Sequence, residues 1–434
     1  MSPDECHDDK LVVFKFGGAS LADIEGVERV AGLLHSLSPG RLLIVASAIG
    51  KTTNALEQLC LAFYNHEQAK AHFVLEAIKQ QHRALVNALV LPSDEAYNHL
   101  ENLFIEIEWV LEDPPHADFN FVYDQIVPVG ELLATRILSA VLSREGLKNT
   151  WTDARDFVYT DNTYREAQID WVVTRDRVRS LLPQMLDKGW VVIQGFIGSS
   201  SENYSTTLGR EGSDYSASVL ASILDAASVT VWKDVAGIMN ADPKIYPKAK
   251  LLEKLSYAEA AELAFYGAKV IHPKTLRPLQ DKMIPLYVRS FLHPELPGTC
   301  VSAQAVEAQY PSFIVKDGQL LVSLHTRDGS FIVEEHLSRI FAIFHSFQVK
   351  MNMMENSALS FSASVDENII ENKISLLLEA LRQSYELHYN TGLTLITVRN
   401  FKCDPGAVDE VFARTEVLVE TRTRTTLQRL VRYS

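Results

Sequence analysis

The chain has 434 residues, of which 47% are hydrophobic and 22% are charged, and its formal net charge at pH 7 is −14. This length is too great for one ordinary hydrophobic core and predicts two or three domains. The acidic balance argues against nucleic acid or an anionic membrane as a partner, because both bind basic surfaces. A site for anionic substrates would have to gather Lys and Arg from several segments.

Cysteine usage and the N-terminal residues indicate a reducing compartment. The four cysteines, Cys6, Cys60, Cys300 and Cys403, form no C-x-x-C pair, so neither a local zinc site nor a redox dithiol is encoded. The start of the chain, MSPDECHDDK, lacks the apolar stretch of a secretory signal. No apolar run approaches the ~18 residues of a spanning helix. We therefore expect a cytoplasmic protein with no membrane partner and no protein-bound metal.

Strands and helices alternate along the first two thirds of the chain. The expected strands are short β-branched or aromatic runs, and the expected helices carry apolar residues on one face, as at Val27, Val30 and Leu34. The pattern predicts strands at 11–16, 41–48, 190–197 and 229–232, and helices up to 37, from about 53, through 65–112, and at 128–144, 215–226 and 256–266. It is typical of an α/β protein with a mostly parallel open sheet covered by helices on both faces.

The pattern changes beyond a Pro/His-rich passage at 291–298, which we expect to be a linker. Strands are predicted at 320–325, 349–354, 358–365 and 392–399, and helices at 333–347 and 369–383. This order suggests small α+β ferredoxin-like modules. We assign residues 1–298 to the first domain and 299–434 to a second region with two modules, about 312–388 and 391–434, the second shortened.

Two glycines, Gly17 and Gly18, follow Lys15 at the end of the first expected strand. Glycines let a backbone approach a phosphate closely, and a lysine at a strand end can reach phosphoryl oxygens. The segment alone is equally compatible with a tight turn beside a solvated lysine. The later Gly50–Lys51–Thr52 is not a P-loop, because Val45 stands where that motif requires glycine.

Further polar residues fall at strand ends of the same region. Arg210 offers a guanidinium that matches a carboxylate, and Asp214 either caps a helix or holds Lys15 in position. Ligands of parallel sheets bind beyond the carboxyl ends of the strands, so Gly17, Gly195–Gly198 and Trp232–Asp234 are expected to converge. The basic residues at these ends and in adjoining loops are Lys15, Arg210, Lys233, Lys244 and Lys269.

Five segments resemble the signature stretches of aspartokinases, in the same order along the chain. They are Lys15–Ser20, Gly130–Leu132, Gln194–Gly198, Thr207–Tyr215 and Phe265–Val270. The resemblance is close over residues 11–300 and looser beyond. The kinases of acetylglutamate, carbamate and UMP share the fold but not this combination of motifs.

This resemblance implies phosphorylation of the L-aspartate side chain by ATP with Mg²⁺, giving 4-phospho-L-aspartate, the first step toward lysine, threonine and methionine. It implies that Lys15, Asp214 and Lys269 are catalytic, with Asp214 orienting the lysines. The implied ATP-binding residues are Lys15, Phe16, Gly17, Gly18, Lys233, Asp234, Met239, Lys244, Lys269 and Val270. The implied aspartate-binding residues are Ser47, Ala48, Thr53, Glu131, Phe196, Arg210 and Ser213, with Arg210 on the α-carboxylate and Glu131 near the amino group.

The chemistry agrees with this set of residues. An aspartate β-carboxylate, with a reference pKa of about 3.9, is already ionised at neutral pH and needs no general base. Ala19, Glu211 and Met239 stand where the family usually has threonine, glycine and tyrosine. None of these departures removes a charged group, so we expect activity to be retained.

The C-terminal region resembles the paired ACT modules of aspartokinases, which implies an amino-acid effector and a homodimer or higher homo-oligomer. Where the family often has a glycine and an acid, the nearest positions here are Glu335 or His336 and Lys350. A lysine would repel the ammonium group of an effector, so we expect dimerisation to be kept and inhibition by lysine to be weak or altered.

Three hypotheses remain open from the sequence. The chain is a monofunctional aspartokinase, being too short for a fused dehydrogenase; or a catalytically silent paralogue that senses amino acids; or another acyl-phosphate kinase of the superfamily. The presence of Lys15, Arg210 and Asp214 argues against the silent paralogue.

Overall fold

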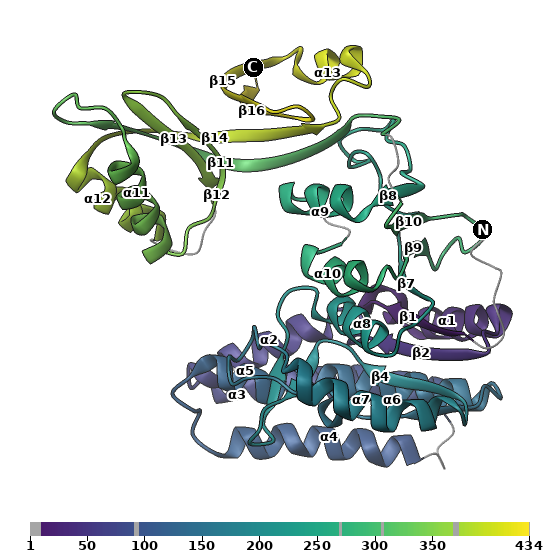
Figure 1. Cartoon of the computed structure of the whole chain (residues 1–434). Coiled ribbons are helices and arrows are strands. Elements are labelled where there is room, and N and C mark those ends of the chain that lie inside the picture. Colours follow the sequence, from purple (N-terminus) through teal and green to yellow (C-terminus); the bar gives the residue numbers. More distant parts are fainter. Residues whose placement is uncertain (1–9, 91–94, 269–270, 305–307, 368–372, 434) are drawn as a thin grey trace. The chain divides into compact units, whose positions relative to one another are not determined.

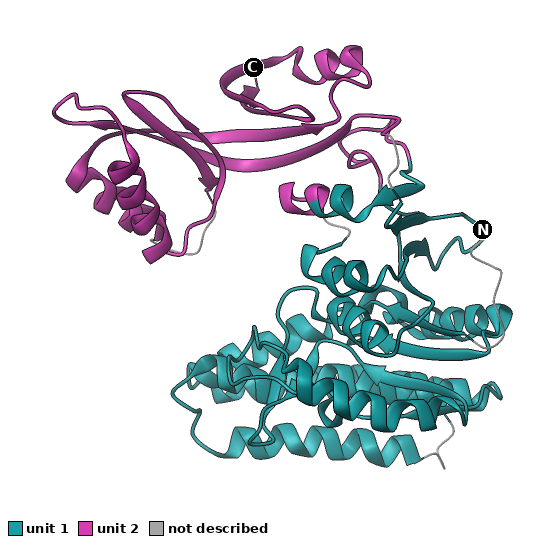
Figure 2. Cartoon of the chain, in the orientation of Figure 1, with its two compact units in different colours: residues 1–238, 251–261, 270–305 teal, residues 239–250, 262–269, 306–434 magenta. Residues whose placement is uncertain are grey.

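The computed structural model describes residues 10–90, 95–268, 271–304, 308–367 and 373–433. The chain forms two compact units (Figure 2). The first comprises residues 1–238, 251–261 and 270–305, and the second comprises 239–250, 262–269 and 306–434. The division is therefore not the single cut at 298 that the sequence suggested, because two short segments before that point belong to the second unit.

The first unit is built on an eight-stranded sheet with strand order β3-β4-β2-β1-β7-β9-β10-β8. Its central strands β1 (Leu11–Phe16), β2 (Arg41–Ala46), β4 (Trp190–Gln194) and β7 (Ser228–Lys233) run parallel to their neighbours. Their side chains are almost all buried, as expected for a sheet covered on both faces. The predicted mostly parallel α/β fold is confirmed (Figure 1).

The edge of this sheet explains the displaced domain boundary. Strand β10 (Thr299–Ser302) pairs with β9 (Leu286–Ser290) antiparallel and with β8 (Lys254–Ser256) parallel. Residues 291–298 thus connect two strands of one sheet and do not link two domains. Proline and histidine in this passage fit a strand connection as well as they fit a linker.

Helices of the first unit largely match the expected positions. They are α1 (Ile24–Leu37), α2 (Thr52–Tyr64), α3 (Gln68–Leu89), α4 (Glu95–Glu112), α5 (Phe119–Ile126), α6 (Val129–Arg144), α7 (Trp171–Leu186), α8 (Gly212–Ile223), α9 (Tyr257–Tyr266, whose second half belongs to the second unit) and α10 (Pro273–Lys282). The run 119–144 is long and apolar enough to be a candidate membrane span by composition, but 83% of its most apolar window is buried inside the protein. Its apolar character is explained by burial in the core.

Two local differences from the expected elements affect the site. The expected strand 190–197 ends at Gln194, and β5 (Ile197–Ser199) forms a hairpin with β6 (Ser205–Thr207) where a loop was expected. Helix α8 begins at Gly212, three residues before the expected start, so Ser213 and Asp214 lie in its first turn. The strands β3 (Asn149–Trp151), β8, β9 and β10 and the helices α5, α7 and α10 were not predicted.

The second unit has a six-stranded antiparallel sheet with order β12-β13-β11-β14-β16-β15. Its strands are β11 (Ser312–Thr326), β12 (Met351–Asn356), β13 (Ser360–Asp366), β14 (Tyr385–Arg399), β15 (Thr415–Arg422) and β16 (Thr426–Tyr433), and its helices are α11 (Glu334–Ser346), α12 (Lys373–Ser384) and α13 (Pro405–Phe412). This confirms the predicted α+β modules. The strands expected at 320–325 and 392–399 are parts of β11 and β14, which pair with each other through both modules.

Candidate active site

The carboxyl ends of four adjacent parallel strands meet at one edge of the first unit's sheet. Lys15 and Phe16 end β1, Ser47 follows β2, Gly195 follows β4, and Lys233 ends β7. Because β4, β2, β1 and β7 are consecutive in the sheet, residues far apart in sequence are brought together here. This is the edge at which α/β sheets bind ligands.

A buried carboxylate lies between two lysines at this edge. Lys15 Nζ is 2.6 Å from Asp214 Oδ1, and Lys233 Nζ is 3.2 Å from Asp214 Oδ2. Asp214 is only 2% exposed and Lys15 only 7%. Burial alone would raise the pKa of Asp214, but Lys15 and Lys233 hold it below its usual value. The carboxylate is therefore ionised and fixes both ammonium groups at the strand ends.

Glu211 adds a second acid to this cluster. It precedes the first turn of α8 with φ of 53°, a left-handed conformation that glycine adopts more easily. Its Oε2 is 3.9 Å from Lys233 Nζ. Burial raises the pKa of Glu211, while Lys233 opposes this shift. Lys233 is thus shared between two carboxyl groups, whereas Lys15 contacts Asp214 alone among the described acids.

The glycines after β1 differ in what surrounds them. A Cβ on Gly18 would lie 2.7 Å from the Ala48 carbonyl oxygen and 2.8 Å from that of Gly50, so only glycine fits there. Gly50 N–H donates to the Gly18 carbonyl at 3.0 Å, which ties the turn after β1 to the turn after β2. A Cβ on Gly17 would meet only Lys15 Nζ, at 3.6 Å. The backbone at Gly17 is thus open on the side of the Lys15 ammonium.

A second buried carboxyl group, Glu131, lies in the first turn of α6. Ala48 N–H donates to its Oε1 at 3.3 Å, and its Oε2 has no partner among the described residues. Burial raises the pKa of Glu131 to about 8, so the group is mostly protonated at pH 7 when no ligand is bound. Ser47 and Thr53 are half-buried on the same loop and helix start. The buried, unpartnered oxygen is suited to a ligand that carries a donor.

The turn after β4 is locked against the start of α8. Phe196 has φ of 71°, and its N–H donates to Ser216 Oγ at 3.0 Å. A Cβ on Gly195 would lie 2.5 Å from Ser213 Cβ, so this glycine is required for the close approach. Phe196 and Ser213 are therefore held side by side. Arg210, in contrast, is exposed and has no ion pair with the residues that the structure describes.

Two residues that the sequence analysis did not single out hold the segment leading to Arg210. The buried Asp124 accepts from Thr207 Oγ1 and N–H, both at 2.8 Å, and burial raises its pKa to about 6. Lys274 Nζ donates to the Leu208 carbonyl at 3.1 Å. The single charged residue of helix α5 is a signal that would have pointed to Asp124, whereas no comparable signal marks Lys274.

The remaining predicted nucleotide contacts are Asp234, Met239, Lys244, Lys269 and Val270. Lys269 and Val270 fall outside the described residues. Met239 and Lys244 belong to the second unit, where Lys244 is exposed. Asp234 is exposed just after β7. Across the described part of the chain no group of three or more His, Cys, Asp or Glu is placed to hold a metal ion.

Comparisons with known proteins show the family to which the chain belongs. The model of the amino acid kinase family matches residues 10–290. Lysine-sensitive aspartokinase 3 of Escherichia coli is 31% identical over 358 residues, which cover 82% of this chain and 78% of that protein. A bifunctional aspartokinase/homoserine dehydrogenase 1 of Arabidopsis thaliana is 30% identical over 87% of this chain, but the match covers only 42% of that longer protein.

The structural comparison extends over both units. The crystal structure of E. coli aspartokinase III in complex with aspartate and ADP has a TM-score of 0.81 at 28% identity, and the match covers 97% of this chain and 96% of that one. Together with the sequence matches, this likeness shows that the chain belongs to the amino acid kinase family and, within it, to the aspartokinases.

Proposed function

We propose that this chain transfers the γ-phosphoryl group of ATP to the side-chain carboxylate of L-aspartate, giving 4-phospho-L-aspartate and ADP. The observation that carries the proposal is the buried Asp214 carboxylate that fixes Lys15 and Lys233 at the carboxyl edge of the sheet. The same edge carries one acidic residue, Glu131, and one basic residue, Arg210. These suit the ammonium group and the carboxylate of an amino acid. The product would supply the synthesis of lysine, threonine and methionine.

The phosphate side of the site fits a nucleotide. Lys15 and Lys233 provide two ammonium groups, and the open backbone at Gly17 leaves room for phosphoryl oxygens beside Lys15. Mg²⁺ would enter with the nucleotide, because this metal is usually held by phosphates and one or two carboxylates. When bound, it would neutralise charge on the phosphates. Asp234, Met239, Lys244, Lys269 and Val270 remain proposed nucleotide contacts.

The aspartate side requires groups that hold the amino acid and leave its side chain free. Arg210 would pair with the α-carboxylate, since a guanidinium binds a carboxylate through two parallel hydrogen bonds. Glu131 would accept from the α-ammonium group through its unpartnered Oε2. The hydroxyl groups of Ser47, Thr53 and Ser213 would complete the polar lining.

The reaction then needs no proton transfer. A β-carboxylate oxygen forms a bond to the γ-phosphorus while the bond from that phosphorus to the bridging oxygen breaks, and ADP leaves with the electron pair. The main barrier is the approach of one anion to another, so the task of the protein is positioning and charge neutralisation. Lys15 and Lys233 perform it because Asp214 fixes them before the substrates arrive.

Replacing Lys15 tests the proposal directly. Lys15→Ala should abolish ADP release with aspartate, because it removes the ammonium group beside Gly17. Leaving a buried charge unpaired costs about 3–5 kcal/mol, but Asp214 keeps Lys233 at 3.2 Å, so the variant should still fold. The measurement is ADP release with aspartate, acetylglutamate or UMP as acceptor, alongside circular dichroism.

Lys70→Ala, which removes an exposed lysine paired only with Glu67 at the start of α3, is the matched control and should retain full activity. Turnover of Lys15→Ala within a few-fold of the unchanged protein would contradict the assignment of the site. A preference of the unchanged protein for acetylglutamate or UMP would contradict the proposed substrate.

The raised pKa of Glu131 predicts that aspartate binding releases a proton. Below pH 8 the free protein holds Glu131 mostly protonated, whereas pairing with an ammonium group requires the ionised form. At pH 7 binding should release close to one proton, and the release should fall as the pH rises through 8. Calorimetric titration in PIPES and in Tris, which differ in ionisation enthalpy, measures it. Glu131→Gln should bind aspartate more weakly and release none; equal heats in both buffers for the unchanged protein would rule out this role.

We predict that replacing Glu211 increases the affinity of the protein for ADP. Glu211→Gly should stabilise the protein by about 1 kcal/mol, because glycine adopts the left-handed conformation without strain. It should also tighten ADP binding, because Lys233 loses a competing carboxylate 3.9 Å away. Glu211→Gln is the matched variant that keeps the strain and removes the charge, so it should tighten ADP binding without added stability. Unchanged ADP dissociation constants in both variants would contradict the competition.

The second unit generates a prediction about regulation. The relative from E. coli has been crystallised with lysine and aspartate, with a TM-score of 0.81 to this chain at 29% identity. Lys350 and Glu335 stand near the positions where the family often has an acid and a glycine. The Lys350 ammonium lies 4.7 Å from the centroid of the Phe265 ring, and the Glu335 carboxylate is 3.6 Å from Arg339. We propose that the modules serve homo-oligomerisation and that lysine inhibits weakly. Titrating lysine and threonine into the activity assay tests this, and inhibition by micromolar lysine would refute it.

A further inference from the structure

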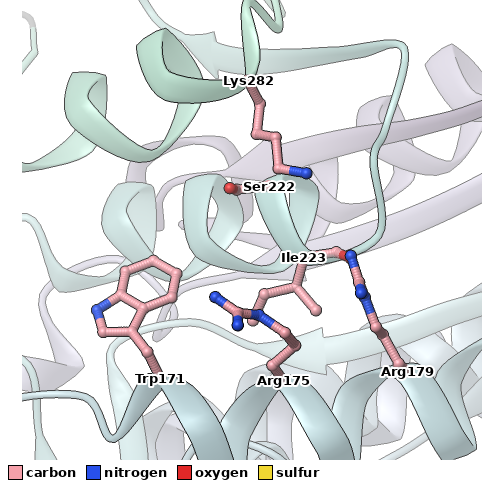
Figure 3. Close-up of a pocket in the computed structure, with 6 residues that line it drawn as sticks. All are labelled: Trp171, Arg175, Arg179, Ser222, Ile223 and Lys282. Carbon is pink, nitrogen blue, oxygen red and sulfur yellow. The ribbon is translucent and has the colours of Figure 1, made fainter.

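A cavity of about 270 Å³ lies in the first unit, away from the strand ends that form the active site. Three elements line it: the first half of α7, the end of α8 and the end of α10. Figure 3 shows the lining side chains, which are Trp171, Arg175, Arg179, Ser222, Ile223 and Lys282. Asp214 lies in the first turn of α8 and Ser222 in its last turn, so at 1.5 Å per residue the two sites are about 12 Å apart along the helix.

The cavity carries an excess of positive charge. Its lining has three basic side chains, and the only acid that pairs with any of them is Asp225, which is 3.3 Å from Arg179 and 2.6 Å from Lys282 among the described contacts. Arg175 has no ion pair with the described residues. The cluster therefore has a charge of about +2 in a protein whose net charge is −14. Such a cluster is not needed for solubility here and is suited to an anion.

Two of these basic side chains already contact the end of α8 or Asp225, through ion pairs that are partly exposed. Arg179 Nε donates to the Ile223 carbonyl at 3.1 Å, at the end of α8, while its terminal nitrogen faces Asp225. Lys282 is fixed by the same carboxylate. Preorganised cations bind an anion with less loss of side-chain entropy than mobile ones. Arg175, free of such contacts, is left to supply the fork for a ligand.

Two further residues of the cavity, Trp171 and Ser222, indicate the shape and polarity of its ligand. Trp171 provides a flat apolar surface beside the Arg175 guanidinium, as the view in Figure 3 shows. Ser222, only 8% exposed, lies below the Lys282 side chain in the same view. The cavity thus has a hydroxyl group and basic side chains on one side and an indole on the other. These walls suit a ligand with an anionic head and a small organic group.

We infer that this cavity binds a small phosphate monoester. A phosphate monoester carries close to two negative charges at pH 7, which matches the charge of the cluster, whereas a single carboxylate would leave one charge uncompensated. The phosphate would lie among Arg175, Lys282 and Ser222, and the organic group would contact Trp171. A volume of about 270 Å³ limits that group to a small ring or chain.

The test is calorimetric titration of the full chain with phenyl phosphate, with ADP and aspartate present at saturation so that the active site is filled. One phenyl phosphate should bind per chain, more tightly than inorganic phosphate or succinate. Arg175→Gln should weaken binding at least tenfold. Trp171→Ala should reduce the affinity for phenyl phosphate to that for inorganic phosphate, because the indole contacts only the organic group.

Arg177→Gln is the matched control. Arg177 lies on the same helix, but its guanidinium faces the Tyr159 ring at 5.4 Å and does not line the cavity, so binding should be unchanged. Repeating the titration without ADP and aspartate makes the result independent of the proposed kinase activity. Without them phenyl phosphate could also bind in the active site, but only binding that Arg175→Gln removes belongs to this cavity. Absence of binding at millimolar phenyl phosphate, equal binding by Arg175→Gln, or tighter binding of succinate would each overturn the proposal.

Discussion

The first unit depends on one buried ionic contact, the Asp214 carboxylate between Lys15 and Lys233. It joins the ends of β1 and β7 to the first turn of α8, and it places two positive charges where an acidic protein would otherwise repel its anionic substrates. Buried charges are costly unless they are paired. The geometry of this triad therefore constrains its neighbours: Gly195 must be a glycine because α8 approaches β4 closely at Ser213.

The two buried acids of the site, Asp214 and Glu131, carry the same carboxyl group but differ in pKa because their surroundings differ. Asp214 and Glu131 are both almost fully buried, yet the pKa of Asp214 is lowered and that of Glu131 is raised. The difference lies in the partners. Asp214 contacts two ammonium groups, while Glu131 receives one backbone hydrogen bond and has an oxygen without a partner. One carboxylate organises the protein, and the other remains available to a ligand.

The sequence predicted the parts of the fold that depend on local pattern. The strand Leu11–Phe16 and the parallel arrangement follow from apolar runs and alternation, and the convergence of Lys15 with Lys233 follows from the geometry of parallel sheets. The start of α8 was placed three residues late, because Gly212 reads locally as a breaker whereas close packing against Phe196 requires glycine there. Asp124 was not predicted as a site residue, although it is the only charged residue of α5, because its partners, Thr207 and Arg165, are far away in sequence. The cavity at Trp171 could not be predicted from the sequence either, because the three helices that line it meet only in the folded protein.

The long strands of the second unit have a consequence for how that unit holds together. Because β11 and β14 pair with each other in both modules, with register shifts between Lys316 and Leu321, their pairing extends from one hydrophobic core to the other. Neither module has a complete set of strands without its neighbour. Unfolding should therefore be a single cooperative event across residues 312–433, and a cut near residue 390 would leave two fragments that each expose half of a strand pair. We therefore expect the two modules to unfold together and not to be stable as separate domains.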